Sequence, residues 1–268
     1  MVLILGQDTN KRNERFGEEK LNHQGCLMKI IDYKSANDIT VEFQDKYKAK
    51  VNTIYANYKI GNIANPYFKS VLNVGMVGSK YNIVNNKKHT KEYEAWYTML
   101  SRCYDEKYKK NRPTYKDVTC CEEWLLYENF YEWLHSQDNF EKWLNGDKWA
   151  LDKDIIIKGN KFYSPETCCL VPHRINSLFL KSDKRRGDLP IGVSYYKYRG
   201  YTYYILSISR KLHDFPIKYF KSPEEAFNTY KIYKEDVIKQ MAQEEYDNGN
   251  ITKECYEAMM NYEVEITD

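Results

Sequence analysis

Hydrophobic and polar residues alternate along this chain with a period that changes from one segment to the next. Between Phe16 and Gly78, the stretches "CLMKIIDY" and "DITVEF" alternate with a period of two on either side of a "KSAND" turn. This alternation predicts strands that are buried on one face. We therefore expect residues 1–78 to form a small β-rich module.

The pattern becomes helical after residue 90. In "KEYEAWYTMLSRCY" and "EEWLLYENFYEWL", large apolar residues recur at helical spacing, which predicts two helices that each carry an aromatic stripe. Aromatic rings on successive turns could stack on nucleobases, but such a stripe is more often core. We interpret both helices as packing support. Residues 79–90 have no period and many Asn and Lys, as is typical of a linker.

The segment 149–176 has the pattern of a strand, a loop, a second strand and a helix. "WALDKDIII" alternates, "KGN" can turn, "TCCLVP" can return as a strand, and Pro172 stands where a helix can begin. Asp152 then lies in the first strand, while His173 and Asn176 share one face of the helix. If this helix crosses the hairpin, Asp152 and Asn176 can converge on one hard cation, because carboxylate and amide oxygens suit Mg²⁺.

The C-terminal third predicts a three-stranded antiparallel sheet followed by a long helix. "GVSYYKYRGYTYYILSISRKLHDFPIKYF" divides into three strands with turns at "RG" and "LHD". Ser222, with Glu225 three residues later, forms a capping box at the start of the helix. The stretch "ITKECYEAMMNYEVEITD" predicts a second, short helix with an acidic end that DNA would repel.

These elements predict a modular α+β fold for the 268 residues. We expect an N-terminal β-rich module (1–78), a linker (79–90), a helical part with the strand–strand–helix unit (91–180), a basic linker (181–189), a sheet-and-helix module (190–243) and a helical tail (244–268). A composition with 42% hydrophobic and 15% aromatic residues supports packed cores. No apolar run approaches the ~20 residues of a membrane span. The expected location is the cytoplasm, and the seven cysteines, without a CxxC pair, predict free thiols and no structural zinc.

Charge is unevenly placed along the chain. Residues 181–221 hold ten Lys or Arg against three Asp, whereas residues 222–268 hold four Lys against twelve Asp or Glu. A cationic module is typical of proteins that bind a polyanion, because neutralised phosphates supply affinity that does not depend on sequence. The alternative is an ordinary solvated strand surface.

Several motifs in order resemble a known family. The blocks "WYTMLSRCY", "CEEW", "LDKD", "YSPETC" and the Asn that ends "HRIN" are similar to the ββα-metal (HNH) nuclease motif of phage homing endonucleases, over residues 91–180. The resemblance implies that Asp152 and Asn176 bind Mg²⁺ or Mn²⁺, which polarises a phosphodiester and stabilises the leaving oxygen. Apart from the resemblance, we expect Asp154 to be structural and Asn160 to support the turn.

One position departs from that family. Lys153 stands where an HNH enzyme has the histidine that activates water, and a protonated lysine has no lone pair with which to accept a proton. His173 could accept the proton from the helix instead, and Lys153 could bind a phosphate as a point charge. The candidate catalytic residues are therefore Lys153 and His173.

The C-terminal module resembles the Apetala-type DNA-binding domain, which phage homing nucleases also carry. The likeness is in "GV" at its start and "FKSPEEAFNTY" at its helix. That family reads the major groove with its sheet, and a β-ribbon fits a groove ~12 Å wide. Strand alternation allows only about half of the candidate side chains to face DNA at once. Together with the basic linker, the resemblance gives these candidate DNA contacts: Lys184, Arg185, Arg186, Tyr195, Lys197, Arg199, Tyr203, Arg210 and Lys211.

The sequence thus predicts a DNA-binding protein of the phage homing-endonuclease type, with double-stranded DNA as its partner and Mg²⁺-dependent cleavage as a possible activity. Two alternatives stay open. One is a non-catalytic DNA-binding regulator that kept the nuclease frame, and the other is a phage protein whose basic surface blocks a host nucleoprotein defence complex. Lys153 favours both alternatives, whereas the pair of Asp152 and Asn176 favours the nuclease.

Overall fold

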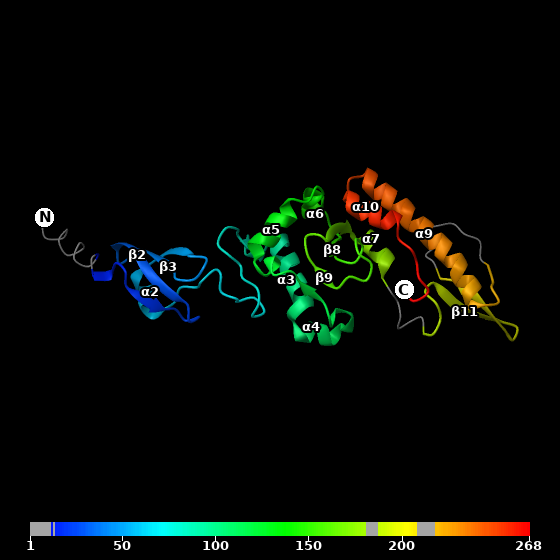
Figure 1. Cartoon of the computed structure of the whole chain (residues 1–268), viewed down its shortest axis with the longest axis horizontal. Helices are drawn as coiled ribbons and strands as arrows, with labels where there is room; N and C mark the ends of the chain where they lie inside the picture. The colour runs from blue at the N-terminus through cyan, green and yellow to red at the C-terminus, as the bar shows by residue number, and fades with distance from the viewer. Residues whose placement is uncertain (1–11, 13, 181–186, 208–217) are drawn as a thin grey trace. The chain divides into compact units, whose positions relative to one another are not determined.

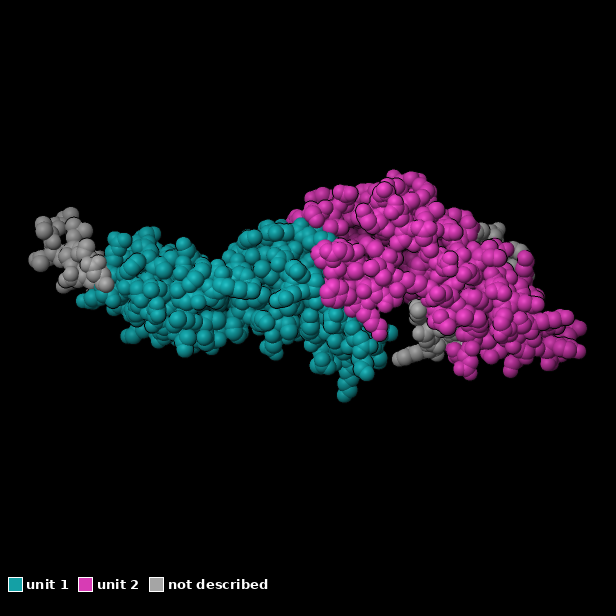
Figure 2. Space-filling model, in the orientation of Figure 1, with its two compact units in different colours: residues 1–133 teal, residues 134–268 magenta. Residues whose placement is uncertain are grey.

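The computed structural model contains both helices and strands, and it describes residues 12, 14–180, 187–207 and 218–268 (Figure 1). The predicted mixed α+β class is confirmed. The chain divides into two compact units, 1–133 and 134–268 (Figure 2). Among the described residues, no helix combines the length and the apolarity that a membrane span requires.

The first unit begins with a four-stranded antiparallel sheet in which neighbours follow chain order. Its strands are β1 (Glu19–Leu21), β2 (Leu27–Ser35), β3 (Asp38–Phe43) and β4 (Lys50–Thr53). Alternate residues such as Ile30, Val41 and Phe43 are buried, as the period of two predicts. Helix α2 (Tyr55–Ile60) follows where no helix was predicted, and Tyr58 joins the same core.

The rest of the first unit is mainly helical. It contains α3 (Lys91–Tyr104), α4 (Glu106–Asn111), η1 (Pro113–Tyr115), β7 (Thr119–Cys120), η2 (Glu123–Leu125) and α5 (Tyr127–His135), which runs across the boundary between the units. The predicted aromatic stripe is core: Trp96, Trp124 and Tyr127 are buried, and the Nε1 atom of Trp96 donates to the carbonyl of Trp124 at 2.7 Å. These rings are therefore packing support, as the sequence indicated.

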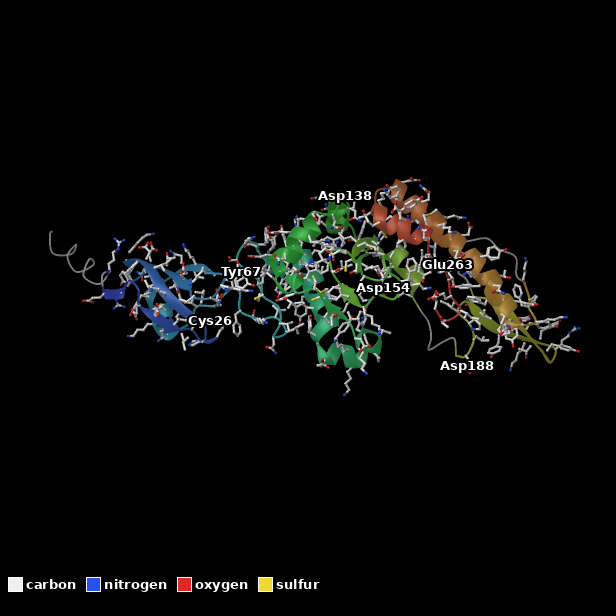
Figure 3. All side chains as sticks on the ribbon, in the orientation of Figure 1. Cys26, Tyr67, Asp138, Asp154, Asp188 and Glu263 are labelled. Carbon is white, nitrogen blue, oxygen red and sulfur yellow. The ribbon has the colours of Figure 1, made fainter. Side chains whose placement is uncertain are left out.

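The segment predicted as a linker, 79–90, has defined structure. It contains the short strands β5 (Val84–Asn85) and β6 (Lys88–His89). The carboxylate of Glu128 on α5 accepts the backbone N–H groups of Ser79 and Lys80, both at 2.7 Å, and the hydroxyl of Tyr67 (Figure 3) at 3.2 Å. Gly78 has φ 83°, and a Cβ there would lie 2.3 Å from the Glu128 carboxyl carbon, so only glycine fits beside this buried acid.

The second unit carries the segments of greatest functional interest. Its elements are α6 (Phe140–Asn145), β8 (Trp149–Asp152), β9 (Phe162–Tyr163), β10 (Cys169–Pro172), α7 (His173–Asn176), η3 (Ser177–Phe179), β11 (Val193–Tyr198), β12 (Tyr201–Leu206), α9 (Pro223–Asp247) and α10 (Lys253–Met260). One cluster of buried apolar side chains runs from Ile155 to Val264. Residues of the strand–strand–helix unit, the sheet-and-helix module and the tail share this core, and the finer division into domains stays a prediction.

The C-terminal hairpin forms as its sequence predicts. β11 and β12 pair antiparallel, and the tip is at Arg199 (φ 48°) and Gly200 (φ 83°), two residues with the positive φ that suits a tight hairpin turn. The predicted turn at 212–214 lies outside the described residues, and the third strand is represented by a bridge between Tyr204 and Phe220. Ser222 is confirmed as the N-cap of α9, because its hydroxyl accepts the N–H of Glu225 at 3.1 Å.

Candidate functional site

Asp152 is the last residue of β8, opposite Cys169 of β10. Its Oδ1 atom accepts the backbone N–H groups of Asp154 at 2.8 Å and Ile155 at 2.9 Å. This local bonding turns the chain out of the sheet. The strand predicted for all of "WALDKDIII" is therefore wrong beyond Asp152. Burial, together with the nearby Asp154 carboxylate, raises the pKa of Asp152 above its ordinary value.

Lys153 is buried, with 7% of its surface exposed. Its ammonium donates to the carbonyl of Asn160 at 2.8 Å and pairs with the carboxylate of Asp154 (Figure 3) at 3.0 Å. The Asn160 amide donates back to the carbonyls of Lys153 at 2.7 Å and Phe162 at 2.6 Å. This reciprocal bonding closes the loop after β8, so Asn160 supports the turn as predicted. The structural role of Asp154 stays a prediction. A catalytic role for Lys153 stays a prediction.

His173 and Asn176 lie at the two ends of α7, which contacts both β8 and β10. The ring of His173 is exposed, and its backbone N–H donates to the carbonyl of Lys148 at 2.7 Å. Asn176 is half-buried. The segment is anchored by Arg174, whose guanidinium pairs with the fully buried Glu245 and with Glu244 at 3.0 Å on α9. No sequence pattern indicated this anchor, because its partners lie about 70 positions away.

The donor set of Asp152 and Asn176 fits a hard divalent cation. Within the described residues no hydrogen bond joins the two side chains, and no three or more His, Cys, Asp and Glu side chains gather at a metal-sized site. An ion held by one carboxylate and one amide oxygen would keep its other positions for water and phosphate, as Mg²⁺ commonly does. The metal centre stays a prediction.

The candidate DNA contacts of the hairpin lie on both of its faces. Val193, Tyr204 and Leu206 pack on the core beneath α9, so their face is the inner one. Strand alternation places Tyr195 and Lys197 on that inner face toward the hairpin tip, and Tyr203 on the outer face. Five further candidates, Lys184, Arg185, Arg186, Arg210 and Lys211, lie outside the described residues.

The outer face of the hairpin is covered with tyrosines. We call it the tyrosine face, and it consists of Tyr196, Tyr198, Tyr201, Tyr203 and Tyr219. The ring centroid of Tyr219 lies 4.9 Å from that of Tyr196 and 6.0 Å from that of Tyr203. Four of the five rings line a surface pocket of about 470 Å³. Only Tyr203 was predicted. The alternation in "SYYKY" and "YTYY" puts Tyr196, Tyr198 and Tyr201 on the same face as Tyr203, but it does not show which face is exposed.

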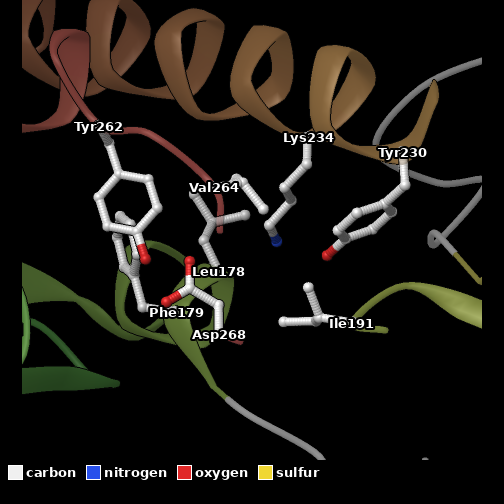
Figure 4. A pocket seen from close by; sticks show the side chains of 8 residues that line it. All are labelled: Leu178, Phe179, Ile191, Tyr230, Lys234, Tyr262, Val264 and Asp268. Atoms are coloured by element: carbon white, nitrogen blue, oxygen red, sulfur yellow. The ribbon is translucent and has the colours of Figure 1, made fainter. Parts of the chain in front are cut away.

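A second, small cavity lies beneath α9 (Figure 4). Its volume is about 20 Å³, room for roughly one water molecule. The ammonium of Lys234 points into it, beside Tyr230 and Ile191, with no hydrogen bond or ion pair to the described part of the chain. Burial lowers the pKa of Lys234. The cavity is too small for a substrate.

Comparison with protein-family models, with curated proteins and with solved structures finds no match for this chain. The likenesses to HNH nucleases and to Apetala-type domains therefore stay predictions, and the function has to be argued from the sites themselves.

Proposed function

We propose that the protein binds DNA through the sheet of its C-terminal segment. The observation that supports this most is the exposed tyrosine face, beside which lie the exposed cations Arg199, at the hairpin tip, and Lys218, next to Tyr219. Lys197 is exposed as well, on the inner face of β11. Lysine and arginine side chains position a phosphate backbone, and tyrosine hydroxyls can also donate to it. The local excess of Lys and Arg in residues 181–221 favours a polyanion as the partner.

DNA binding is tested with the full-length protein and a labelled short duplex, by fluorescence anisotropy at several salt concentrations. We expect binding that weakens as salt rises, because neutralised phosphates release counterions. Arg199→Asn should weaken it several-fold, and Asn tolerates the positive φ at this position. Lys239→Asn, at an exposed position on α9, is the matched control. If no DNA binds at low salt, the proposal is wrong.

Mg²⁺-dependent strand cleavage is a second candidate function. Its support is the contact of α7 with β8, which puts Asn176 on a helix next to the strand that ends at Asp152. When bound, the ion would polarise a phosphodiester and stabilise the leaving oxygen. Asp152 and Asn176 would hold it, and the exposed imidazole of His173 would accept a proton. The hydrogen bonds of Lys153 instead favour the non-catalytic regulator.

Asp152→Asn separates the chemistry from the fold, because the amide oxygen can still accept the N–H groups of Asp154 and Ile155. Supercoiled DNA is incubated with each protein in Mg²⁺, Mn²⁺ or chelator. Nicking by the wild type that is lost in the variant supports the nuclease. Intact DNA with salt-sensitive binding supports the regulator, and a preference for a host nucleoprotein complex over naked DNA supports the inhibitor.

A further inference from the structure

We infer that the tyrosine face binds unpaired bases, so that the protein prefers single-stranded or locally opened DNA to an intact duplex. The inference rests on the proposed DNA binding and narrows its substrate. It concerns which part of the nucleotide the sheet contacts, and it differs from the groove reading that the Apetala resemblance implies.

The rings of this face are available to a ligand. Tyr198, Tyr201 and Tyr219 are 51%, 69% and 52% exposed, and Tyr196 and Tyr203 are partly covered by Tyr219 between them. Within the part of the chain that the structure describes, α9 packs on the opposite side of the hairpin and does not cover the outer side. Contiguous exposed aromatic surface is uncommon on a soluble domain and usually marks a binding site.

The composition of the face favours base stacking over groove reading. In an intact duplex the faces of the bases are stacked on one another, and only their edges reach the grooves, where Arg, Lys, Asn and Gln are the usual readers. On the described outer side of β11 and β12 none of these four residue types occurs. A tyrosine ring can use its flat surface only against a base that has left the stack.

The spacing of the tyrosine rings fits a bound DNA single strand whose bases are spread apart. The centroids of Tyr196 and Tyr198 lie 6.5 Å apart with a 15° angle between the rings, and those of Tyr201 and Tyr203 are also 6.5 Å apart. This is the two-residue repeat of a β-strand. It is roughly twice the ~3.4 Å rise of stacked bases, so the rings match bases that have been pulled apart.

Positively charged side chains lie beside the aromatic surface and favour a nucleic acid as its ligand. The guanidinium of Arg199 lies 5.2 Å from the ring centroid of Tyr198 at the hairpin tip. Lys218 and Lys221 flank Tyr219 on the neighbouring segment, and Lys218 is exposed. Aromatic platforms beside positive charge are the usual arrangement for single-stranded nucleic acid, because the rings take the bases and the cations take the phosphates.

The test compares three labelled DNAs of equal length with the full-length protein: a single strand, a duplex and a duplex with a central unpaired bubble. We expect the single strand and the bubble to bind more tightly than the duplex. Tyr203→Leu and Tyr219→Leu should each weaken single-strand binding about tenfold, with the salt dependence unchanged. Tyr203→Phe should bind like the wild type, because stacking needs the ring and not the hydroxyl. Tyr97→Leu, at an exposed position on α3, is the matched control.

The outcomes separate this inference from the proposed function. If the duplex binds as tightly as the single strand, or if the folded Tyr203→Leu and Tyr219→Leu variants keep full single-strand affinity, unpaired-base binding is wrong while DNA binding stands. If none of the three DNAs binds at low salt, both proposals fail. Equal losses in Tyr203→Phe and Tyr203→Leu would assign the contact to the hydroxyl and would also overturn base stacking.

Discussion

Lys153 is predicted from its position in the motif to be catalytic, but its contacts in the structure are those of a stabilising residue. Its ammonium is enclosed by the Asn160 carbonyl and the Asp154 carboxylate. Lys153→Met should therefore lower the free energy of unfolding by about 1–3 kcal/mol, because the partly buried Asn160 carbonyl loses its donor. Urea unfolding followed by circular dichroism measures this, with Lys239→Met at an exposed position as the control. Equal stability of the two variants would show that the loop does not need the lysine.

Lys234 predicts a change of stability with pH. Burial lowers its pKa below the ordinary 10.5, so the folded state carries a poorly solvated charge at neutral pH. Between the lowered pKa and about 10.5 the unfolded chain binds more protons, and stability rises with pH. We expect Lys234→Met to be more stable than the wild type at neutral pH by about 1 kcal/mol. The difference in stability between the two proteins, measured by thermal unfolding, should shrink as the pH approaches the ordinary pKa of lysine.

A constant difference between Lys234→Met and the wild type across the alkaline range would contradict this account. It would assign the gain to better packing of the methionine in the small cavity and not to the charge. Lys231→Met is a suitable control, because Lys231 lies one turn earlier on α9 and pairs with Glu235 at 3.5 Å.

The sequence indicated local roles better than distant ones. The role of Asn160 in a turn was predictable, because its side chain bonds to backbone groups a few positions away. The end of the strand at Asp152 was not predicted, although it too rests on local bonds to Asp154 and Ile155. The burial of Lys153 was not predictable, because lysine in a strand is usually exposed and its enclosure depends on how the following loop closes. The tyrosine face was missed for a similar reason: alternation defines two faces, and only the packing of α9 shows which is free.

At the scale of elements, α9 depends on its first turn. The Ser222 hydroxyl accepts the N–H of Glu225, which otherwise has no partner at a helix start. Ser222→Ala should destabilise the second unit by about 1 kcal/mol. Ser207→Ala, at an exposed position after β12, should change stability by less than ~0.5 kcal/mol. Thermal unfolding of both variants checks this, and equal shifts would show that the cap contributes nothing specific.

Helices and strands long enough to show a regular hydrophobic pattern were predictable, and short ones were not. The strands β2 and β3, the β11–β12 hairpin and α9 follow from alternation, turn residues and a cap. Helix α2 has only six residues, too few to show a helical period, and it is held by tertiary contacts: Tyr58 is buried, and its hydroxyl donates to the carbonyl of Glu18 at 2.9 Å. The predicted linker at 79–90 also owes its structure to a distant residue, Glu128.

At the scale of the whole molecule, the net charge of +3 hides two opposite segments. If DNA affinity followed net charge alone, removing any two lysines would have the same effect. If DNA affinity depends on charges at the C-terminal sheet, the double substitution Lys197→Gln and Lys218→Gln should weaken binding. The double substitution Lys239→Gln and Lys253→Gln should not. Both pairs remove two positive charges, the first at exposed positions on β11 and next to Tyr219, and the second at exposed positions on α9 and α10.

The salt dependence makes this comparison quantitative. For duplex DNA the slope of log affinity against log salt concentration falls by about 0.9 for each phosphate contact that is lost, and by about 0.7 for a single strand. We therefore expect the double substitution at Lys197 and Lys218 to reduce the magnitude of this slope by the equivalent of one to two phosphate contacts. The double substitution at Lys239 and Lys253 should leave the slope unchanged. Anisotropy titrations over a range of KCl concentrations measure both. Equal slopes for the two double variants would mean that DNA affinity depends on the total charge of the protein. The proposal that the sheet contacts DNA would then be wrong.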